Sequence, residues 1–176
     1  MDWIWKRQKF IAMLRPQKEQ DTNPSVRGAI FPASKRVLGI FRSNPLSSDI
    51  QAFFAQVTFA VVGASRSRAK YGNRVLRMYQ RLGWPVTPVN PHAAEIEGLP
   101  CAEDLGGVSP LPDAISVITP PSVTTSVVRE AIRLGIEHIW LQPGADSVEA
   151  IQACEEAGIN VIWGGPCILV DAPGAT

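Results

Sequence analysis

The sequence has few of the residues that bind metals or form disulfides. Its 176 residues include three cysteines, Cys101, Cys154 and Cys167, and two histidines, His92 and His138. Three widely spaced cysteines do not make a disulfide framework, and neither residue type has the spacing of a four-ligand zinc site. We therefore expect a reducing compartment and no metal cofactor.

Long apolar runs are lacking, and so is a basic excess in most of the chain. No window reaches the ~18 apolar residues that a membrane span needs. Residues 49–176 contain eight Lys and Arg against thirteen acidic residues, whereas non-specific nucleic-acid binding depends on a basic face. The sequence thus predicts neither a membrane partner nor a nucleic-acid partner.

The chain has enough apolar residues, 45%, to form one core of ordinary size. Residues 1–48 differ from the rest, with nine Lys and Arg against three acidic residues and four prolines that interrupt any long helix. We interpret them as a tail: either a mitochondrial transit peptide removed near residues 43–48, or a disordered cytosolic segment, with Met13 an alternative start. The predicted location is accordingly the mitochondrial matrix or the cytoplasm.

One segment is typical of a phosphate-binding strand, loop and helix. An apolar run at residues 59–62 ends at Gly63, and a polar loop then leads to Gly72 and a helical pattern. The first glycine permits a sharp turn, Gly72 lets the backbone pass close to a ligand or to the sheet, and free N–H groups at the helix start would face an anion. Because Ala64 and Ser65 follow Gly63, only the first glycine of the Gly-x-Gly-x-x-Gly fingerprint is present.

Short apolar runs alternate with helical patterns from residue 49 onward, and a glycine suited to a left-handed cap follows the later helices, at Gly83, Gly135 and Gly158. Such repeats predict an α/β fold: a Rossmann-like, doubly wound parallel sheet of five or six strands between two layers of helices. The expected strands are 58–62, 86–89, 114–118, 138–141 and 161–163, with a short edge strand at 99–102; the expected helices are 50–56, 73–82, 123–134 and 148–157, with a single turn at 103–105.

The expected strand order is 3-2-1-4-5, or 3-2-1-4-5-6 with six strands. Asp49, Ser122 and Ser147 are the expected helix N-caps. In sheets of this kind ligands lie beyond the carboxyl ends of the strands, where the strand order reverses. We therefore expect ligand residues in the loops that follow the strands, at 63–72, 90–92, 119–122, 142–144 and 164–167.

The loop after the second strand distinguishes between nucleotides. NAD sites place an Asp or Glu about 20 residues after the glycines, at the end of this strand. Here the strand ends in Asn90, Pro91 and His92, which repel no anion, so a nucleotide with an extra ribose phosphate fits better than NAD. The alternative is that Asn90 and Pro91 only end the strand in a turn.

Six short motifs, taken in their order along the chain, resemble a known family. The resemblance is to stand-alone CoA-binding-domain proteins, which are related to the N-terminal domain of the succinyl-CoA synthetase alpha subunit. It covers about residues 53–170 and implies a Rossmann-like fold that holds CoA by its phosphates and adenosine. The motifs are Gly63-Ala-Ser-Arg, Pro88-Val-Asn-Pro91, Glu95-Ile-Glu-Gly98, Thr119-Pro-Pro121, Ile139-Trp-Leu-Gln-Pro-Gly144 and Gly158-Ile-Asn-Val-Ile162.

The resemblance also implies a ligand site. Beside it, the loop cations Arg66, Arg68 and Lys70 either clamp phosphates or form a solvated loop, and we expect one of them to contact the ligand. The candidate residues are Gly63, Ala64, Ser65, Arg66, Ser67, Lys70, Tyr71 and Gly72 for the diphosphate, Asn90, Pro91 and His92 for the adenosine end, and Thr119, Pro120 and Pro121 for the far wall.

The sequence offers no set of nucleophile, base and orienting group. Ser65 has no accompanying histidine motif, and His138 begins a predicted buried strand. The related synthetases need a second domain with a phosphorylated histidine, and we expect none here. Cys167 follows the last predicted strand near the pocket, where an exposed thiolate would form a mixed disulfide with CoA; the alternative is a buried, inert cysteine.

The leading hypothesis is a non-catalytic module that binds CoA or acyl-CoA, with an unidentified protein partner. One alternative is an NAD(P)-binding oxidoreductase, in which Tyr71 and His92 are the titratable candidates. The other is a vestigial nucleotide fold that associates with partners through exposed apolar residues around Trp140 and Trp163, although tryptophans in strands more often belong to the core.

Overall fold

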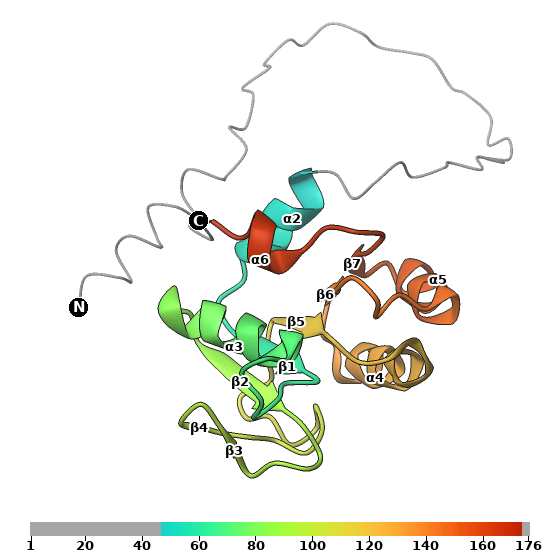
Figure 1. Ribbon diagram of the computed structural model, residues 1–176. Helices are drawn as coiled ribbons and strands as arrows, with labels where there is room; N and C mark the ends of the chain where they lie inside the picture. The colour runs from blue at the N-terminus through green and yellow to red at the C-terminus, as the bar shows by residue number, and fades with distance from the viewer. Residues whose placement is uncertain (1–46, 174–176) are drawn as a thin grey trace, which may run out of the picture. The chain divides into compact units, whose positions relative to one another are not determined.

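The computed structural model describes residues 47–173, which form a parallel sheet with helices on both faces (Figure 1). Residues 1–46 of the predicted tail lie outside the described residues. The five strands of the sheet are β1 (Phe59–Val62), β2 (Val86–Val89), β5 (Ala114–Val117), β6 (His138–Leu141) and β7 (Asn160–Ile162), and a separate hairpin contains β3 (Glu95–Ile96) and β4 (Leu99–Pro100). The helices are α2 (Ser47–Phe54), α3 (Tyr71–Arg81), α4 (Pro121–Leu134), α5 (Val148–Glu156) and α6 (Ile168–Asp171).

The sheet has the order β2-β1-β5-β6-β7, and every pair of neighbours is parallel. The chain moves from β1 to one side for β2 and then crosses to the other side for β5, so the strand order reverses at β1. This confirms the predicted doubly wound α/β sheet. The predicted edge strand does lie beside β2, but a single bridge between Val89 and Ala102 joins it there, because β4 pairs with β3 instead.

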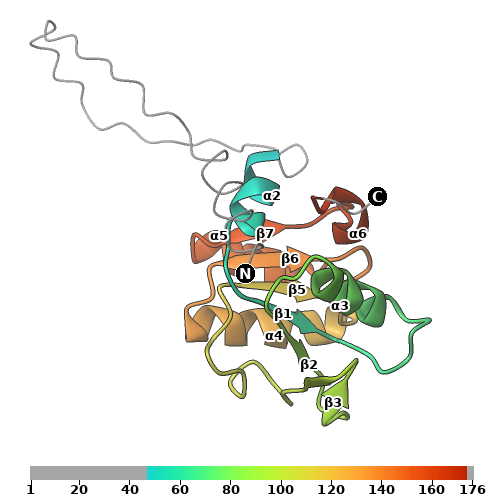
Figure 2. The same ribbon diagram turned by 90° about the vertical axis from the view of Figure 1, so that its left-hand side faces the viewer.

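Two apolar clusters, one on each face of the sheet, make up the core. Phe53, Leu76 and Ile168 belong to the cluster under α2, α3 and α6, and Val128 and Cys154 belong to the cluster under α4 and α5. Figure 2 shows α3 and α6 on one side of the sheet and α4 on the other. The strands between them are buried on both faces, which explains their short, continuous apolar runs.

The helix starts differ from the expected ones at two places. Pro121 begins α4, because the fixed φ of proline suits the first helical position, so Ser122 lies inside the helix and is not its cap. Likewise α2 begins at Ser47, which places Asp49 in the first turn. Ser147 does cap α5, since its side chain accepts a hydrogen bond from the Ala150 N–H.

Of the other local predictions, the glycine caps are confirmed and the single helical turn is not. Gly83, Gly135 and Gly158 adopt φ values of +69°, +80° and +70° after their helices, which confirms the predicted left-handed positions. Residues 103–105 form bends in place of the expected helical turn, and α6 was not expected. Among the described helices, none combines the length and the apolar character needed to cross a bilayer.

Candidate ligand site at the carboxyl edge of the sheet

Two glycines allow α3 and the loop before it to lie against the end of β1. Gly63 has φ +88°, and a Cβ there would lie 2.9 Å from the carbonyl oxygen of Ile118, which follows β5. Gly72, in the first turn of α3, lies so close to Gly63 that a Cβ on it would overlap the Gly63 carbonyl oxygen. Of the two roles expected for Gly72, the structure thus shows close packing against the sheet.

The helices that follow β1 and β5 both begin at this edge without a side-chain cap. Lys70 is the N-cap residue of α3 and Pro120 that of α4, and neither side chain accepts a hydrogen bond from its helix. By contrast, Ser147 caps α5. The first turn of a helix has N–H groups without intrahelical partners and a partial positive charge. The start of α3, with a cation as its N-cap, is therefore suited to an anionic ligand.

Side-chain amides hold the loop between β1 and α3 in place. Asn73, in the first turn of α3, donates from Nδ2 to the Ser65 carbonyl at 2.8 Å. Asn90, at the end of β2, donates from Nδ2 to the Ala64 carbonyl at 2.6 Å. Within the loop, the Ser65 hydroxyl accepts from the Ser67 N–H at 3.2 Å. These bonds connect the loop to α3 and to the end of β2.

Both polar atoms of the Asn90 side chain have partners inside the protein. While Nδ2 contacts Ala64, Oδ1 accepts from the His92 N–H at 2.8 Å. This geometry matches the turn predicted as the alternative for Asn90 and Pro91, and adenosine contact at these two residues stays a prediction. Pro91 and His92 are exposed beside them, and the Arg66 guanidinium donates to the His92 carbonyl at 3.4 Å.

An ion pair that the sequence did not reveal holds the loop to the β3–β4 hairpin. Arg68 donates to the Glu97 carboxylate from Nε at 3.0 Å and from Nη2 at 2.6 Å, and Asn73 donates to the same carboxylate at 2.9 Å. Glu97 has φ +52°, a conformation that non-glycine residues seldom adopt. Arg68 is therefore occupied, whereas Arg66 and Lys70 are exposed and have no ion pair within residues 47–173.

Hydrogen bonds from Arg68 and then Asn73 lower the pKa of Glu97 from 4.5 to about 2. A carboxyl group with a lowered pKa contributes stability above its unfolded pKa, and that stability is lost as the pH falls through the folded pKa. We expect Glu97→Gln to lower the thermal midpoint at pH 7 and to flatten its decline between about pH 4.5 and 2. Midpoints measured across this range test this, with the exposed Glu95→Gln as control; parallel curves for wild type and Glu97→Gln would contradict it.

The far wall of the candidate site is the start of α4. Thr119 exchanges a hydrogen bond with the Thr124 hydroxyl at 2.9 Å, which orders the turn into the helix. Pro120 and Pro121 follow and are exposed. Because β5 lies next to β1, these residues lie across the end of the sheet from the Gly63 loop. Whether they contact a ligand stays a prediction.

Tyr71, Gln142 and Cys167 form a side-chain cluster at the end of β6. The Tyr71 hydroxyl donates to Gln142 Oε1 at 3.0 Å and lies 2.8 Å from Cys167 Sγ. Burial, and then the contact with Cys167, raises the pKa of Tyr71 above its ordinary value. Cys167 is part-buried, so neither the exposed nor the buried alternative describes it fully, and sequence spacing gave no sign of its contact with Tyr71.

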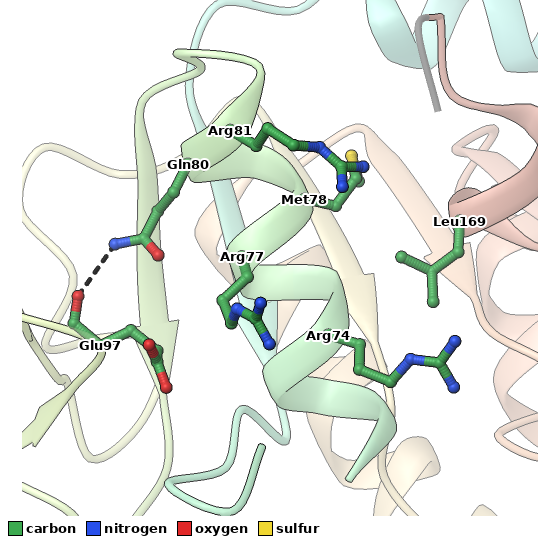
Figure 3. A pocket seen from close by; sticks show the side chains of 7 residues that line it. All are labelled: Arg74, Arg77, Met78, Gln80, Arg81, Glu97 and Leu169. Carbon is green, nitrogen blue, oxygen red and sulfur yellow. Dashed lines mark hydrogen bonds between the residues drawn. The ribbon is translucent and has the colours of Figure 1, made fainter. Parts of the chain in front are cut away.

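A groove of about 450 Å³ runs along the outward side of α3. Figure 3 shows three arginine side chains on this helix, with Glu97 on one side and Leu169 of α6 on the other. The groove contains none of the predicted ligand residues, but it extends the basic surface of the loop. Residues 66–81 include six of the eight cations in residues 49–176, and residues 50–94 contain no acid. The lining residues are Arg74, Arg77, Met78, Gln80, Arg81, Glu97 and Leu169.

Two residues considered for other functions lie elsewhere. Trp140 is fully buried in the core, as tryptophans in strands more often are, so it does not contribute to the exposed apolar surface of the vestigial-fold alternative. His138 lies at the start of β6, at the opposite edge of the sheet, where its Nδ1 contacts the Asn160 amide at 3.2 Å and burial lowers its pKa. No three His, Cys, Asp or Glu side chains in the described residues gather closely enough to hold a metal ion.

Comparison with known proteins agrees with this architecture. Residues 57–173 match the family described as CoA binding domain. The chain belongs to this CoA-binding domain family. The family match spans the whole sheet, from the residues before β1 to the end of α6.

Three relatives of this CoA-binding domain illustrate its range. A conserved hypothetical protein of Pyrococcus furiosus has a solved structure with 40% identity and a TM-score of 0.62, and the match covers 65% of this chain and 98% of that one. YneT of Bacillus subtilis is 27% identical over 68% of this chain and 89% of its own. An ADP-forming acetate–CoA ligase of Archaeoglobus fulgidus is also 27% identical, over 68% of this chain but 19% of the ligase. Members thus occur both as small proteins and as part of a CoA-dependent ligase.

Proposed function

We propose that this domain binds CoA or an acyl-CoA across the carboxyl ends of β2, β1 and β5. The start of α3 is the observation that carries the proposal. It has no side-chain cap, its N-cap is Lys70, and the Gly63 loop brings it directly to the end of β1. A diphosphate bound there would meet free N–H groups and the positive end of the helix.

The distribution of charge supports a ligand with several phosphates. Although residues 49–176 are acidic overall, their cations are concentrated at 66–81. Arg66 and Lys70 are exposed at the loop with no ion pair among the described residues. CoA has a ribose phosphate in addition to its diphosphate, and a charge-assisted hydrogen bond contributes about 1.5–3 kcal/mol.

The end of β2 supports CoA over NAD. An NAD site would place a carboxylate there to bind the ribose hydroxyls. In its place the chain has Asn90, whose amide positions the Gly63 loop, and the exposed His92. An extra ribose phosphate therefore meets no acidic side chain at this position.

We propose further that the domain acts by binding and presenting CoA, with a protein partner supplying chemistry. Of the two titratable candidates at the loop, Tyr71 stays protonated because its pKa is raised, and His92 is exposed. His138 lies at the opposite edge of the sheet, so it provides no base at the loop. The A. fulgidus ligase, in which the matched region is 19% of the chain, is consistent with a domain that works beside other domains.

A thermal-shift series on the full chain tests CoA binding. At 100 times its dissociation constant a ligand adds about 2.7 kcal/mol of stability, which corresponds to roughly 5–15 °C for a domain of this size. We expect such a shift with CoA and acetyl-CoA and a much smaller one with NAD or NADP. A shift with NAD or NADP alone would favour an oxidoreductase, and no shift with any of the four would contradict the proposal.

A double variant, Arg66→Ala with Lys70→Ala, tests the position of the site, and the single variant Arg129→Ala is its control. All three arginine and lysine side chains are exposed, so the fold should persist in each variant. Removing two cations from the loop should weaken CoA binding by tenfold or more, about 1.4 kcal/mol, whereas the change on α4 should leave it unaltered. Equal CoA shifts in both variants would place the ligand elsewhere.

A further inference from the structure

The cluster of Tyr71, Gln142 and Cys167 brings a thiol to the proposed ligand site. Tyr71 is the first residue of α3, whose N-terminus is the proposed diphosphate site. Its side chain extends to the end of β6, where Gln142 lies, and the chain returning from β7 places Cys167 Sγ 2.8 Å from the Tyr71 hydroxyl. Trp140 Nε1 holds this returning segment by donating to the Pro166 carbonyl at 3.1 Å.

Gln142 provides an independent sign that something binds here. Its side chain is fully buried. The Ile168 N–H donates to Oε1 at 3.0 Å, and so does the Tyr71 hydroxyl, so Oε1 is identified as the acceptor. Nε2 is then a buried donor with no partner among the described residues. A buried donor without an acceptor destabilises the fold, and an amide carbonyl of a ligand would offset this cost.

The pantetheine arm of CoA has such groups in the right order. It carries two amides, each with a carbonyl acceptor, and it ends in a thiol. An arm that leaves the diphosphate at α3 and passes the end of β6 would meet Gln142 Nε2 and then Cys167. The neighbouring β1, β5 and β6 are parallel, so their carboxyl ends form one continuous edge along which the arm can lie.

The tyrosine hydroxyl can serve Cys167 in both of its protonation states. With a thiol, the S–H donates to the Tyr71 oxygen while Tyr71 donates to Gln142. With a thiolate, the Tyr71 O–H turns to Sγ, and Gln142 Oε1 keeps its bond from Ile168. The raised pKa of Tyr71 keeps its proton available for this second arrangement.

We propose that Cys167 captures CoA as a mixed disulfide, an inference that rests on the proposed CoA binding. The Cys167 thiolate attacks one sulfur of CoA disulfide, the Cys167–CoA disulfide forms as the original S–S bond breaks, and one CoA leaves as its thiolate. The thiol proton is transferred to water, and the Tyr71 O–H stabilises the attacking sulfur. A reducing thiol reverses the reaction by the same exchange.

The other two cysteines are not placed for this reaction. Cys101 Sγ donates to the backbone carbonyls of Asn90 and Ala102, and burial raises its pKa. Cys154 lies on the buried face of α5, and burial raises its pKa to about 12. Cys167 is part-buried, as Cys101 is, but it differs from both in its contact with the hydroxyl of Tyr71, a residue of the proposed ligand site.

The test is incubation of the full chain with CoA disulfide, followed by intact-mass and peptide mass spectrometry. We expect one CoA on Cys167, formed at least about tenfold faster than the adduct from glutathione disulfide, slowed by adenosine 3′,5′-bisphosphate and removed by dithiothreitol. Cys101→Ser should react as wild type does, and Cys167→Ser should form no adduct. No adduct on Cys167, or an adduct as fast with glutathione disulfide or unaffected by the bisphosphate, would overturn the inference.

CoA binding measured in dithiothreitol separates this inference from the proposed function. We expect wild type and Cys101→Ser to bind reduced CoA within about threefold of each other, since no disulfide with CoA forms under these conditions. Binding without an adduct would overturn only the thiol capture. If neither protein binds CoA, the proposed function fails as well, and any adduct then reflects an accessible thiol without a CoA site.

Discussion

Trp140→Ala is expected to lower the free energy of unfolding by about 3–5 kcal/mol, the usual range for truncating a buried tryptophan. The indole is fully buried and packs edge-on against Phe53, with ring centroids 5.2 Å apart. It also donates a hydrogen bond to the Pro166 carbonyl. The substitution therefore leaves a cavity between β6 and α2 and frees the segment that places Cys167.

Urea unfolding followed by circular dichroism measures this effect. Val170→Ala is the control, because Val170 lies in α6 with 74% of its surface exposed, and such changes stay within about 0.5 kcal/mol. If Trp140→Ala lowers the free energy of unfolding by less than about 1.5 kcal/mol, the indole is not part of the core. An exposed apolar surface around Trp140 would then be supported.

Gly72→Ala is expected to destabilise the domain by about 1–3 kcal/mol, as overpacking does, and to weaken CoA binding at least tenfold. Helix propensity alone gives the opposite sign, since alanine is favoured over glycine within a helix by up to about 1 kcal/mol. Here the added Cβ would overlap the Gly63 carbonyl oxygen. The start of α3 must then move away from β1, and with it the N–H groups proposed to bind the diphosphate.

Unfolding free energies and CoA titrations of the variant test both parts of this prediction. Gly107→Ala is the matched control, because a Cβ at Gly107 would have its nearest neighbour at 3.6 Å, an ordinary contact. Greater stability of Gly72→Ala than of wild type would show that α3 does not pack against β1 in this way. Unchanged CoA affinity in a destabilised variant would separate the ligand from the start of α3.

The sheet and most of the helices could be predicted because their signals are local. Each strand is a short apolar run, and the glycines at 83, 135 and 158 follow helices with the positive φ expected of them. Boundaries were less certain where two start signals compete. Pro121 begins α4 although Ser122 resembles a cap, and α3 begins at Tyr71, two residues before the expected start.

The contacts within the site could not be predicted, because they join residues far apart in the sequence. Arg68 and Glu97 are 29 positions apart and Tyr71 and Cys167 are 96 apart, so spacing gave no indication that they meet. Glu97 also adopts a positive φ, which no local pattern indicated. The Asn90 side chain donates to the Ala64 carbonyl and accepts from the His92 N–H. The first of these bonds also joins residues distant in the sequence, so it could not be predicted either.

Isothermal titration of the full chain with CoA in dithiothreitol tests the central claim most directly. The account predicts one saturable site per chain, an affinity for NADP at least about tenfold weaker, or 1.4 kcal/mol, and CoA binding weakened by tenfold or more in the variant that lacks Arg66 and Lys70. No heat of binding and no saturation at millimolar CoA, or equal affinity for CoA and NADP, would contradict it.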